Sequence, residues 1–336
     1  MKRVTLDLDQ LVEDGELTTA EADRLAGFAV QSRQLQAIIN ILMIFGAIAV
    51  AAGVIALEPS ATTGLILALV ALGGGAAIYM QPSTEWRVLS HGLIIMGCLG
   101  LSGWMGWQAY EHPETMPDWT PQLLSAILFT AAAIFFRQGF LAALSPLAIG
   151  ALIGSGTAYW HASYALFVEE PTISIFVFSA MAGGLYFLRD KIPPIYEGIS
   201  TIAARVAFFM LNFAFWVGSL WGDRLLEHWQ KPDYKANYDW EAYEAWRNSA
   251  INVPEAVFSL GWAALLGGCI WLGTRDHRRF LANTALVFLA IHFYTQLFET
   301  LGAEPIILVF AGLSMVGAAV GVARFDNWLR GHTAKA

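Results

Sequence analysis

Runs of about twenty consecutive apolar residues recur along almost the whole chain, and they constrain its fold more than any other feature. A helix of this length crosses the roughly 30 Å hydrocarbon core of a bilayer. The 336 residues are 57% hydrophobic and 14% charged, whereas about a quarter of the residues in a soluble globular domain are charged. The sequence therefore predicts an all-α, polytopic membrane protein. About ten spans are expected, near residues 35–57, 61–80, 88–110, 121–136, 138–160, 170–188, 198–222, 254–273, 279–300 and 303–323.

The positions of the basic residues support this assignment of membrane spans. Lys and Arg collect in the cytoplasmic loops of membrane proteins, and nearly all of them fall on one side here if the N-terminus is cytoplasmic. The exceptions are Arg205, inside the seventh span, and four residues of one long loop: Arg224, Lys231, Lys235 and Arg247. We therefore expect both termini in the cytoplasm.

This topology divides the chain into a cytoplasmic segment 1–34, a membrane domain 35–323 and a cytoplasmic tail 324–336. About thirty polar residues precede the first span, which is not the pattern of a cleaved signal peptide, so that span is expected to stay in place. The formal net charge of −8 is spread over both sides. It indicates no nucleic-acid partner.

The first 34 residues have the pattern of a short helical hairpin. Leu8, Leu11 and Val12 form an apolar stripe, Gly15 can end that helix, and Thr18 with Glu21 forms a capping box that starts a second one. Two such short helices are marginal alone. They are expected to dock either on the cytoplasmic loops of this chain or on another copy or partner.

The run LVEDGELTTAEA, from residue 11 to residue 22, is followed by a glycine-containing first span and then by further spans. This arrangement resembles bacterial membrane proteins of the domain of unknown function 2157 type. The resemblance covers the N-terminal hairpin and the first few spans. It implies a multi-pass protein of the bacterial inner membrane and supplies no catalytic residues.

Small residues lie where helices are expected to contact one another. Gly97, Gly100, Gly103 and Gly106 recur at every third position of the third span, and such positions let helix backbones approach closely within a membrane. The alternative is that glycines beside Pro146 mark broken helices that line a substrate path.

A row of polar residues interrupts the ninth span. His292, Gln296 and Glu299 follow i, i+4, i+7 spacing and so share one helix face, with Glu299 nearest the periplasm and His292 about two turns deeper. They either hydrogen-bond to neighbouring helices or line a periplasm-facing cavity for a cation, a proton or a polar head group. A metal site is a third reading, but no further ligands can be identified, so we predict none.

The seventh span raises a similar question at Arg205. Its side chain can reach the inner head groups by snorkelling, and Asn212, seven residues on, extends the same polar face toward the membrane centre. The alternative is an inward-facing anionic site, or a partner for a lipid phosphate.

The long loop 223–253 is expected to be periplasmic, and it is rich in aromatic residues. Within it, the stretch DWEAYEAWRN predicts a short helix whose Trp240, Tyr243 and Trp246 form an aromatic strip. This helix is expected either to lie on the outer face of the bilayer or to act as a lid or docking surface for a sugar, a cationic ligand or a partner protein.

The sequence shows no motif that would identify an enzyme, although an intramembrane site assembled from separate helices would leave none. GxSxG, Walker-type, HExxH and redox cysteine motifs are absent, and Cys98 and Cys269 are expected to be packing residues on separate spans. We predict no catalytic residue and no cofactor. The leading hypothesis is handling or transport of a small solute, ion or lipid through a polar cavity near spans seven and nine. The alternative is a non-transporting scaffold in an envelope assembly, with a second copy or an envelope protein as partner.

Overall fold

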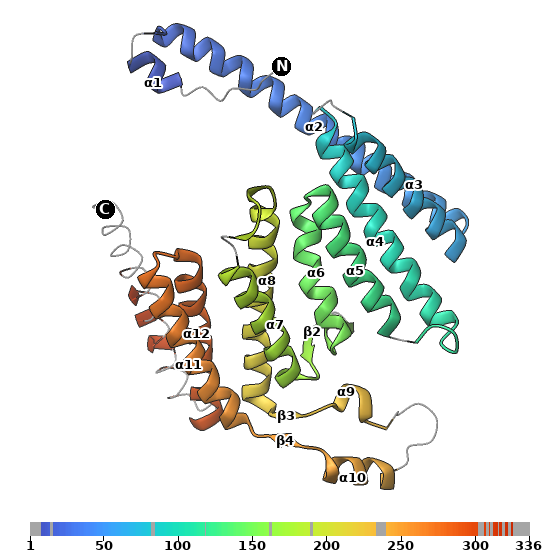
Figure 1. Ribbon diagram of the computed structural model, residues 1–336, viewed down its shortest axis with the longest axis vertical. Coiled ribbons are helices and arrows are strands. Elements are labelled where there is room, and N and C mark those ends of the chain that lie inside the picture. The colour runs from blue at the N-terminus through green and yellow to red at the C-terminus, as the bar shows by residue number, and fades with distance from the viewer. Residues whose placement is uncertain are drawn as a thin grey trace. The chain divides into compact units, whose positions relative to one another are not determined.

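The computed structural model describes residues 8–13, 16–81, 85–117, 119–160, 163–188, 191–232 and 240–301, with isolated positions between 306 and 324. The chain forms two compact units, Met1–Leu141 and Ala142–Ala336. Both units are built mainly of helices, as the sequence predicts (Figure 1).

Seven helices among the described residues are long and apolar enough to cross a membrane. They are Ile38–Leu57 of α2, α3 (Ala61–Tyr79), α4 (Arg87–Glu111), α5 (Trp119–Phe136), α8 (Pro194–Trp221), α11 (Glu255–Arg275) and α12 (Arg279–Thr300 of Arg279–Leu301). Two further apolar helices are shorter, α6 (Gly139–Leu152) and α7 (Pro171–Phe187). The expected tenth span, residues 303–323, lies largely outside the described residues. The membrane class is therefore supported, whereas the count of ten remains a prediction.

The N-terminal unit begins with α1 (Leu8–Glu13) and α2 (Thr19–Leu57). The capping box is confirmed, because the Glu21 amide donates to Thr18 Oγ1 and the Thr18 amide donates to Glu21 Oε2. The second helix of the expected hairpin is not a separate short helix, however, because α2 is one continuous helix of 39 residues, or about 58 Å, that includes the first span. No proline interrupts it. Gly15 lies outside the described residues.

Glycines bring α3 and α4 into close contact. A Cβ atom added to Gly97 would lie 2.6 Å from the backbone nitrogen of Leu72, and one added to Gly100 would lie 2.8 Å from the Cβ of Ala68. Gly103 and Gly106 have no atom within 4 Å of such a Cβ atom among the described residues. The predicted glycine contact is therefore confirmed for the first half of the row only.

The C-terminal unit begins within α6, which differs from the expected fifth span. The helix passes through Pro146 and ends at Leu152, and Gly154 follows with a φ of +78°. Glycine adopts this left-handed conformation without the steric cost that a Cβ atom brings, so it ends helices. The expected span 138–160 is therefore wrong in its second half, where β1 (Ser155–Trp160) pairs antiparallel with β2 (Ser163–Val168).

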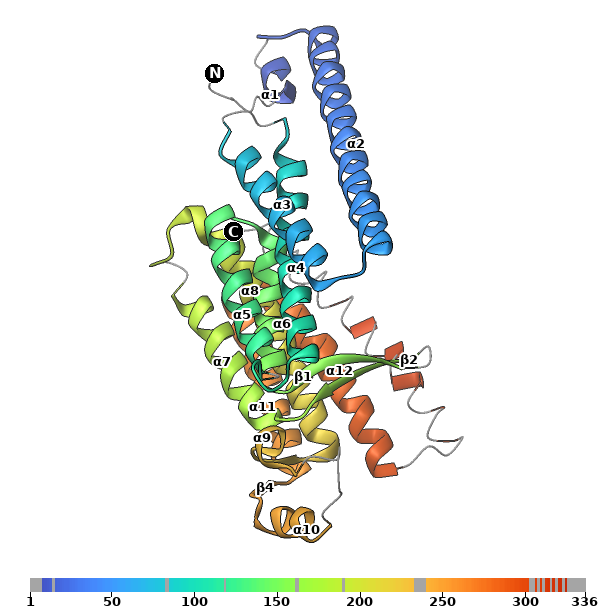
Figure 2. The same cartoon turned by 90° about the vertical axis from the view of Figure 1, so that its right-hand side faces the viewer.

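The remaining helices of this unit form two antiparallel pairs, α7 with α8 and α11 with α12, and α8 also contacts α11 (Figures 1 and 2). Phe178, Phe208 and Leu211 belong to one buried cluster. Trp262, Leu266 and Phe288 belong to a second. These two clusters hold together the four helices that surround the candidate site.

The connection between α8 and α11 extends from one end of these helices. It contains β3 (Asp223–Arg224), α9 (Glu227–Gln230), α10 (Trp240–Ser249) and β4 (Asn252–Val253). β3 pairs with β4 and so closes the base of the connection (Figure 1). We call this end of the unit the loop end. The opposite end, which holds the turn between α11 and α12, is called the arginine end.

Candidate functional site: a two-arginine cavity

A cavity of about 310 Å³ lies within the C-terminal unit, among α7, α8, α11 and α12. Its wall is mainly apolar. Phe208 and Leu211 of α8, Leu265 and Cys269 of α11 and Leu281 of α12 contribute to it. On the α7 side, Gly183 leaves open space, because an added Cβ atom would have no described neighbour within 4 Å. The cavity can therefore accept an apolar group.

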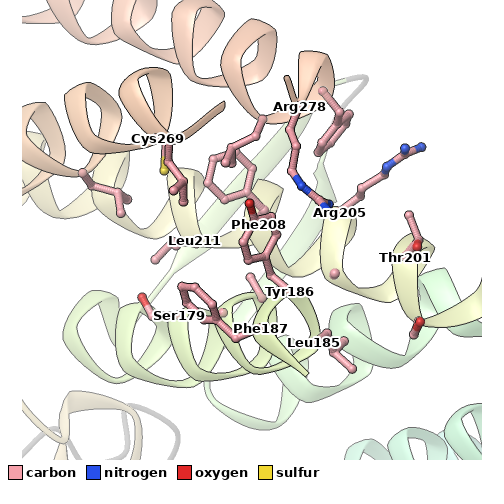
Figure 3. A pocket seen from close by; sticks show the side chains of 18 residues that line it. Ser179, Leu185, Tyr186, Phe187, Thr201, Arg205, Phe208, Leu211, Cys269 and Arg278 are labelled. Atoms are coloured by element: carbon pink, nitrogen blue, oxygen red, sulfur yellow. The ribbon is translucent and has the colours of Figure 1, made fainter. Parts of the chain in front are cut away.

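Two arginines stand at one end of this cavity, Arg205 and Arg278, while Leu211 and Ser179 lie toward the other end (Figure 3). The Cζ atom of Arg205 lies 4.6 Å from the ring centroid of Phe280. That of Arg278 lies 4.8 Å from the ring of Tyr186. Cation–π contacts of this kind hold a guanidinium group in place without neutralising its charge.

Neither guanidinium group forms an ion pair with a carboxylate within the part of the chain that the structure describes. Arg205 is exposed and Arg278 is half-buried. Asp276 is close by, but its Oδ2 accepts a hydrogen bond from the Tyr186 hydroxyl at 3.1 Å. Both guanidinium groups thus keep their charge; the Arg278 side chain points toward Phe208 and Tyr186, whereas the Arg205 side chain extends outward from the cavity (Figure 3).

The turn between α11 and α12 explains the position of Arg278. His277 has a φ of +54°, and the Arg278 amide donates to the Gly273 carbonyl at 2.6 Å, which satisfies a free carbonyl near the end of α11. A Cβ atom on Gly273 would lie 2.7 Å from the Ala282 nitrogen. The two helices therefore meet closely, and the short turn directs Arg278 to the cavity.

Of the five cavity residues predicted from the sequence, all described, only Arg205 is among those that line this cavity. Asn212 is fully buried. Its Nδ2 donates to the Phe208 carbonyl at 2.7 Å, and its Oδ1 accepts from Trp262 Nε1 at 3.0 Å. Asn212 thus joins α8 to α11 in the manner of a polar helix contact.

The predicted row on α12 also lies against neighbouring helices. The His292 ring is 8% exposed and its centroid lies 4.8 Å from that of Trp262. Next to it, Trp216 Nε1 donates to Thr295 Oγ1 at 3.2 Å. Gln296 is half-buried and Glu299 is exposed. Nδ1 of His292 is buried without a hydrogen-bond partner in the described part of the chain. Both interpretations of the row, helix contact and cavity wall, therefore stay predictions.

The aromatic helix is present as α10. Trp240 and Tyr243 stack with ring centroids 5.7 Å apart and planes 8° apart, and Trp246 follows at 5.7 Å and 42°. Trp240 is 58% exposed whereas Trp246 is 8% exposed. The strip therefore runs from the surface into the fold. The expected capping residue Asp239 lies outside the described residues.

Sequence reasoning missed Arg278 and Tyr186. In the sequence, Arg278 stands out only as one of the basic residues expected on the cytoplasmic side, together with Arg275 and Arg279. The signal that could have singled it out is the turn itself, because only two residues, Asp276 and His277, separate it from the end of α11.

Comparison with known proteins gives no match: no protein-family model, curated protein or solved structure corresponds to this chain. The resemblance to the domain of unknown function 2157 therefore stays a prediction. Among the described residues, no group of three or more His, Cys, Asp or Glu side chains could hold a metal ion.

Proposed function

We propose that the protein binds an anionic amphiphile, a lipid or lipid-like molecule with a phosphate or carboxylate head group, in the two-arginine cavity. The observation that carries this proposal is the pair Arg205 and Arg278 at one end of a mainly apolar cavity. Arginine matches the geometry of phosphate and carboxylate groups with two parallel hydrogen bonds. The apolar wall suits an acyl chain.

The surroundings of the arginines support a membrane lipid as the ligand. Basic pockets between transmembrane helices on the cytoplasmic side bind anionic lipid head groups. In the proposed orientation, Arg275, Arg278 and Arg279 lie on the cytoplasmic side of a bacterial inner membrane, as the positive-inside rule requires. A lipid could then enter the cavity from the inner leaflet.

Retained lipid in the purified protein would test this proposal. We expect native mass spectrometry to detect bound phosphatidylglycerol, and addition of phosphatidylcholine should not displace it. Arg205→Gln and Arg278→Gln should each weaken binding about tenfold or more, because a hydrogen bond to a charged group contributes about 1.5–3 kcal/mol.

Arg275→Gln is the matched control. Arg275 also lies over an aromatic ring, with Cζ 5.3 Å from the Trp271 centroid, but it does not line the cavity. Its loss should leave retention unchanged. Equal retention by the wild type and by the Arg205→Gln/Arg278→Gln double variant would contradict the proposal.

A scaffold function is the second candidate, and the length of α2 favours it. Helix α2 begins at Thr19, ahead of the first span expected near residues 35–57, and α1 contacts it. A rigid arm of this kind is suited to hold a partner. Deletion of residues 1–34 should then abolish partner capture in cells while lipid retention remains. Unchanged capture after the deletion would exclude this role for the arm.

A further inference from the structure

A second cavity lies at the loop end of the C-terminal unit, where α7 begins, α8 ends and β3 pairs with β4 (Figure 1). Its volume is about 270 Å³, close to the lower end of the range for small-molecule sites, about 300 Å³. Its wall is mainly polar and includes Glu169, Asp223, Arg224, Glu227 and Asn252. The cavity therefore has room for a small polar organic group. We call it the loop-end cavity.

Two buried carboxylates hold the walls of this cavity together. Glu170 is 0% exposed, and its Oε2 and Oε1 accept the amides of Leu226 and His228 at 2.9 Å and 2.7 Å. In the opposite direction, Asp223 Oδ2 accepts the amide of Thr172, in the first turn of α7, at 2.8 Å. The segment that follows α8 is thus tied to the start of α7 at three amides. The loop-end cavity is therefore built into the fold.

Two of the carboxylates that line the cavity already have basic partners. Glu169 Oε2 contacts His228 Nδ1, and Glu227 Oε1 accepts from Lys231 Nζ at 2.6 Å. These pairs lie within the chain itself, so they create no demand for a ligand. The groups that remain are the two residues of β3.

Asp223, the first residue of β3, has one carboxylate oxygen without a partner. The residue is 4% exposed, and its Oδ1 is buried with no hydrogen-bond partner in the described part of the chain. A buried acceptor without a donor is costly. Burial also raises the pKa of Asp223 above its ordinary 3.8, and an opposite charge in the cavity would offset this cost of desolvation. A cationic donor would satisfy both needs.

Arg224, the second residue of β3, lines the same cavity and is half-buried. Its guanidinium group forms no ion pair with a carboxylate of the described residues. Arginine binds phosphate and carboxylate groups with two parallel hydrogen bonds. The two groups of β3 thus require opposite charges, and one ligand satisfies both only if it carries a cation and an anion close together.

The depth of the cavity indicates where such a ligand comes from. Val217 and Trp221, which line it, belong to the last two turns of α8, a helix long and apolar enough to cross a membrane. Trp221 is 72% exposed, and exposed tryptophans at the ends of spans lie at the level of the lipid head groups. The loop-end cavity is therefore placed to meet a head group.

We propose that the loop-end cavity binds the phosphoethanolamine head group of a membrane lipid. The ammonium group donates to Asp223 Oδ1, and the phosphate binds the Arg224 guanidinium. A choline head group has the same charges but no N–H group, so it cannot donate to Asp223. This site is separate from the two-arginine cavity, and it does not depend on the function proposed for that cavity.

Lipid competition tests the proposal with the purified, full-length protein. The protein in detergent is mixed with phosphatidylethanolamine and phosphatidylcholine of identical acyl chains, and native mass spectrometry measures which lipid is retained. We expect a preference of about tenfold or more for the ethanolamine lipid, the effect of one hydrogen bond to a charged group. Soluble O-phosphoethanolamine, titrated into the protein by calorimetry without added lipid, tests the free compound as the ligand.

Variants at β3 locate the preference. Asp223→Asn, which keeps an oxygen for the Thr172 amide, and Arg224→Gln should each abolish it. Glu255→Gln and Arg247→Gln are the matched controls, because both residues are exposed at the loop end and neither lines the cavity. They should behave as the wild type. If Asp223→Asn fails to fold, Arg224→Gln still tests the proposal, since Arg224 forms no ion pair in the described part of the chain.

Three results would overturn the proposal. The first is equal retention of the two lipids together with no binding of soluble O-phosphoethanolamine. The second is a preference that persists in both β3 variants, because it would then arise elsewhere on the protein. The third is equal retention of the lipids with binding of the soluble compound that both variants abolish, which would assign the cavity to a free solute. Retention of phosphatidylglycerol in the two-arginine cavity should stay unchanged in every β3 variant.

Discussion

At the scale of single residues, Asn212 links the cavity wall to the helix core. Its neighbours Phe208 and Leu211 line the cavity, whereas its own amide group accepts from Trp262 and donates to a backbone carbonyl. The seven-residue spacing from Arg205 predicts a shared polar face, whereas Arg205 lines the cavity and the fully buried Asn212 does not. The spacing could not show that Trp262, fifty residues away, would donate a hydrogen bond to the Asn212 side chain.

We expect Asn212→Leu to destabilise the protein, because it leaves the Trp262 Nε1–H group without an acceptor. Polar contacts between membrane helices average about 0.6 kcal/mol, and an unsatisfied buried donor costs about 1–3 kcal/mol. Unfolding in mixed micelles measures the change. In a double-mutant cycle with Trp262→Phe, the effect of Asn212→Leu should shrink, and strictly additive effects would contradict the pairing.

The glycine row of α4 allows a test of the close contact between α3 and α4. Gly97→Ala places a Cβ atom against the Leu72 backbone, which cannot move aside as a side-chain end can. Overpacking of this kind costs about 1–3 kcal/mol. Gly103→Ala enters open space on the same helix, so it should leave the free energy of unfolding unchanged or raise it slightly, since alanine favours helix. Similar losses in both variants would mean that the α3–α4 contact is not the cause.

At the scale of elements, most helices could be predicted because apolar length is a property of a local run of residues. The sequence indicated α3, α4, α5, α8, α11 and α12 near their observed bounds. The expected fifth span failed for a local reason, the left-handed Gly154, and for a non-local one, the pairing of Ser155 with Val168. A count of apolar residues covers only a local run of the chain, so it cannot detect a strand partner that lies outside that run.

Gly154→Ala should therefore be costly. A left-handed conformation costs an L-residue about 1–2 kcal/mol, and the added Cβ atom would lie 3.0 Å from both Glu169 Oε2 and His228 Nδ1. The variant should lower the free energy of unfolding and reduce protection of residues 222–231 against hydrogen exchange. Gly184→Ala, in the helical part of α7 with open space around it, serves as the control. Equal stability of the two variants would show that Gly154 does not enforce the turn.

At the scale of the whole molecule, the candidate site depends on contacts among helices that are distant in the sequence. The i, i+4, i+7 spacing predicts that His292, Gln296 and Glu299 share one face of α12. Which helices α12 meets depends on Trp262 of α11, which contacts His292, and on Trp216 of α8, which donates to Thr295. The two-arginine cavity combines residues of α7, α8 and the α11–α12 turn. The packing of these helices alone brings the residues together. The sequence therefore could not show that Arg278 and Arg205 line the same cavity.

The C-terminal unit is expected to lie in the membrane with its loop end toward the periplasm and its arginine end toward the cytoplasm. In a Cys98→Ala/Cys269→Ala background, Glu299→Cys and Trp240→Cys at the loop end should react with an impermeant thiol reagent added from the periplasm. His277→Cys at the arginine end should react only after the membrane is opened. His292→Cys should be protected in both conditions, because the ring it replaces is buried against Trp262.

Two outcomes of this labelling would change the functional interpretation. Periplasmic labelling at position 277 would reverse the orientation, and an anionic lipid would then have to enter from the outer leaflet. Labelling at position 292 would mean that water reaches the α11–α12 contact, and the row on α12 would again be a candidate cavity wall. Protection at both positions, with labelling at 240 and 299, leaves the arginine end facing the anionic inner leaflet, where the electrostatic attraction for a lipid head group is strongest.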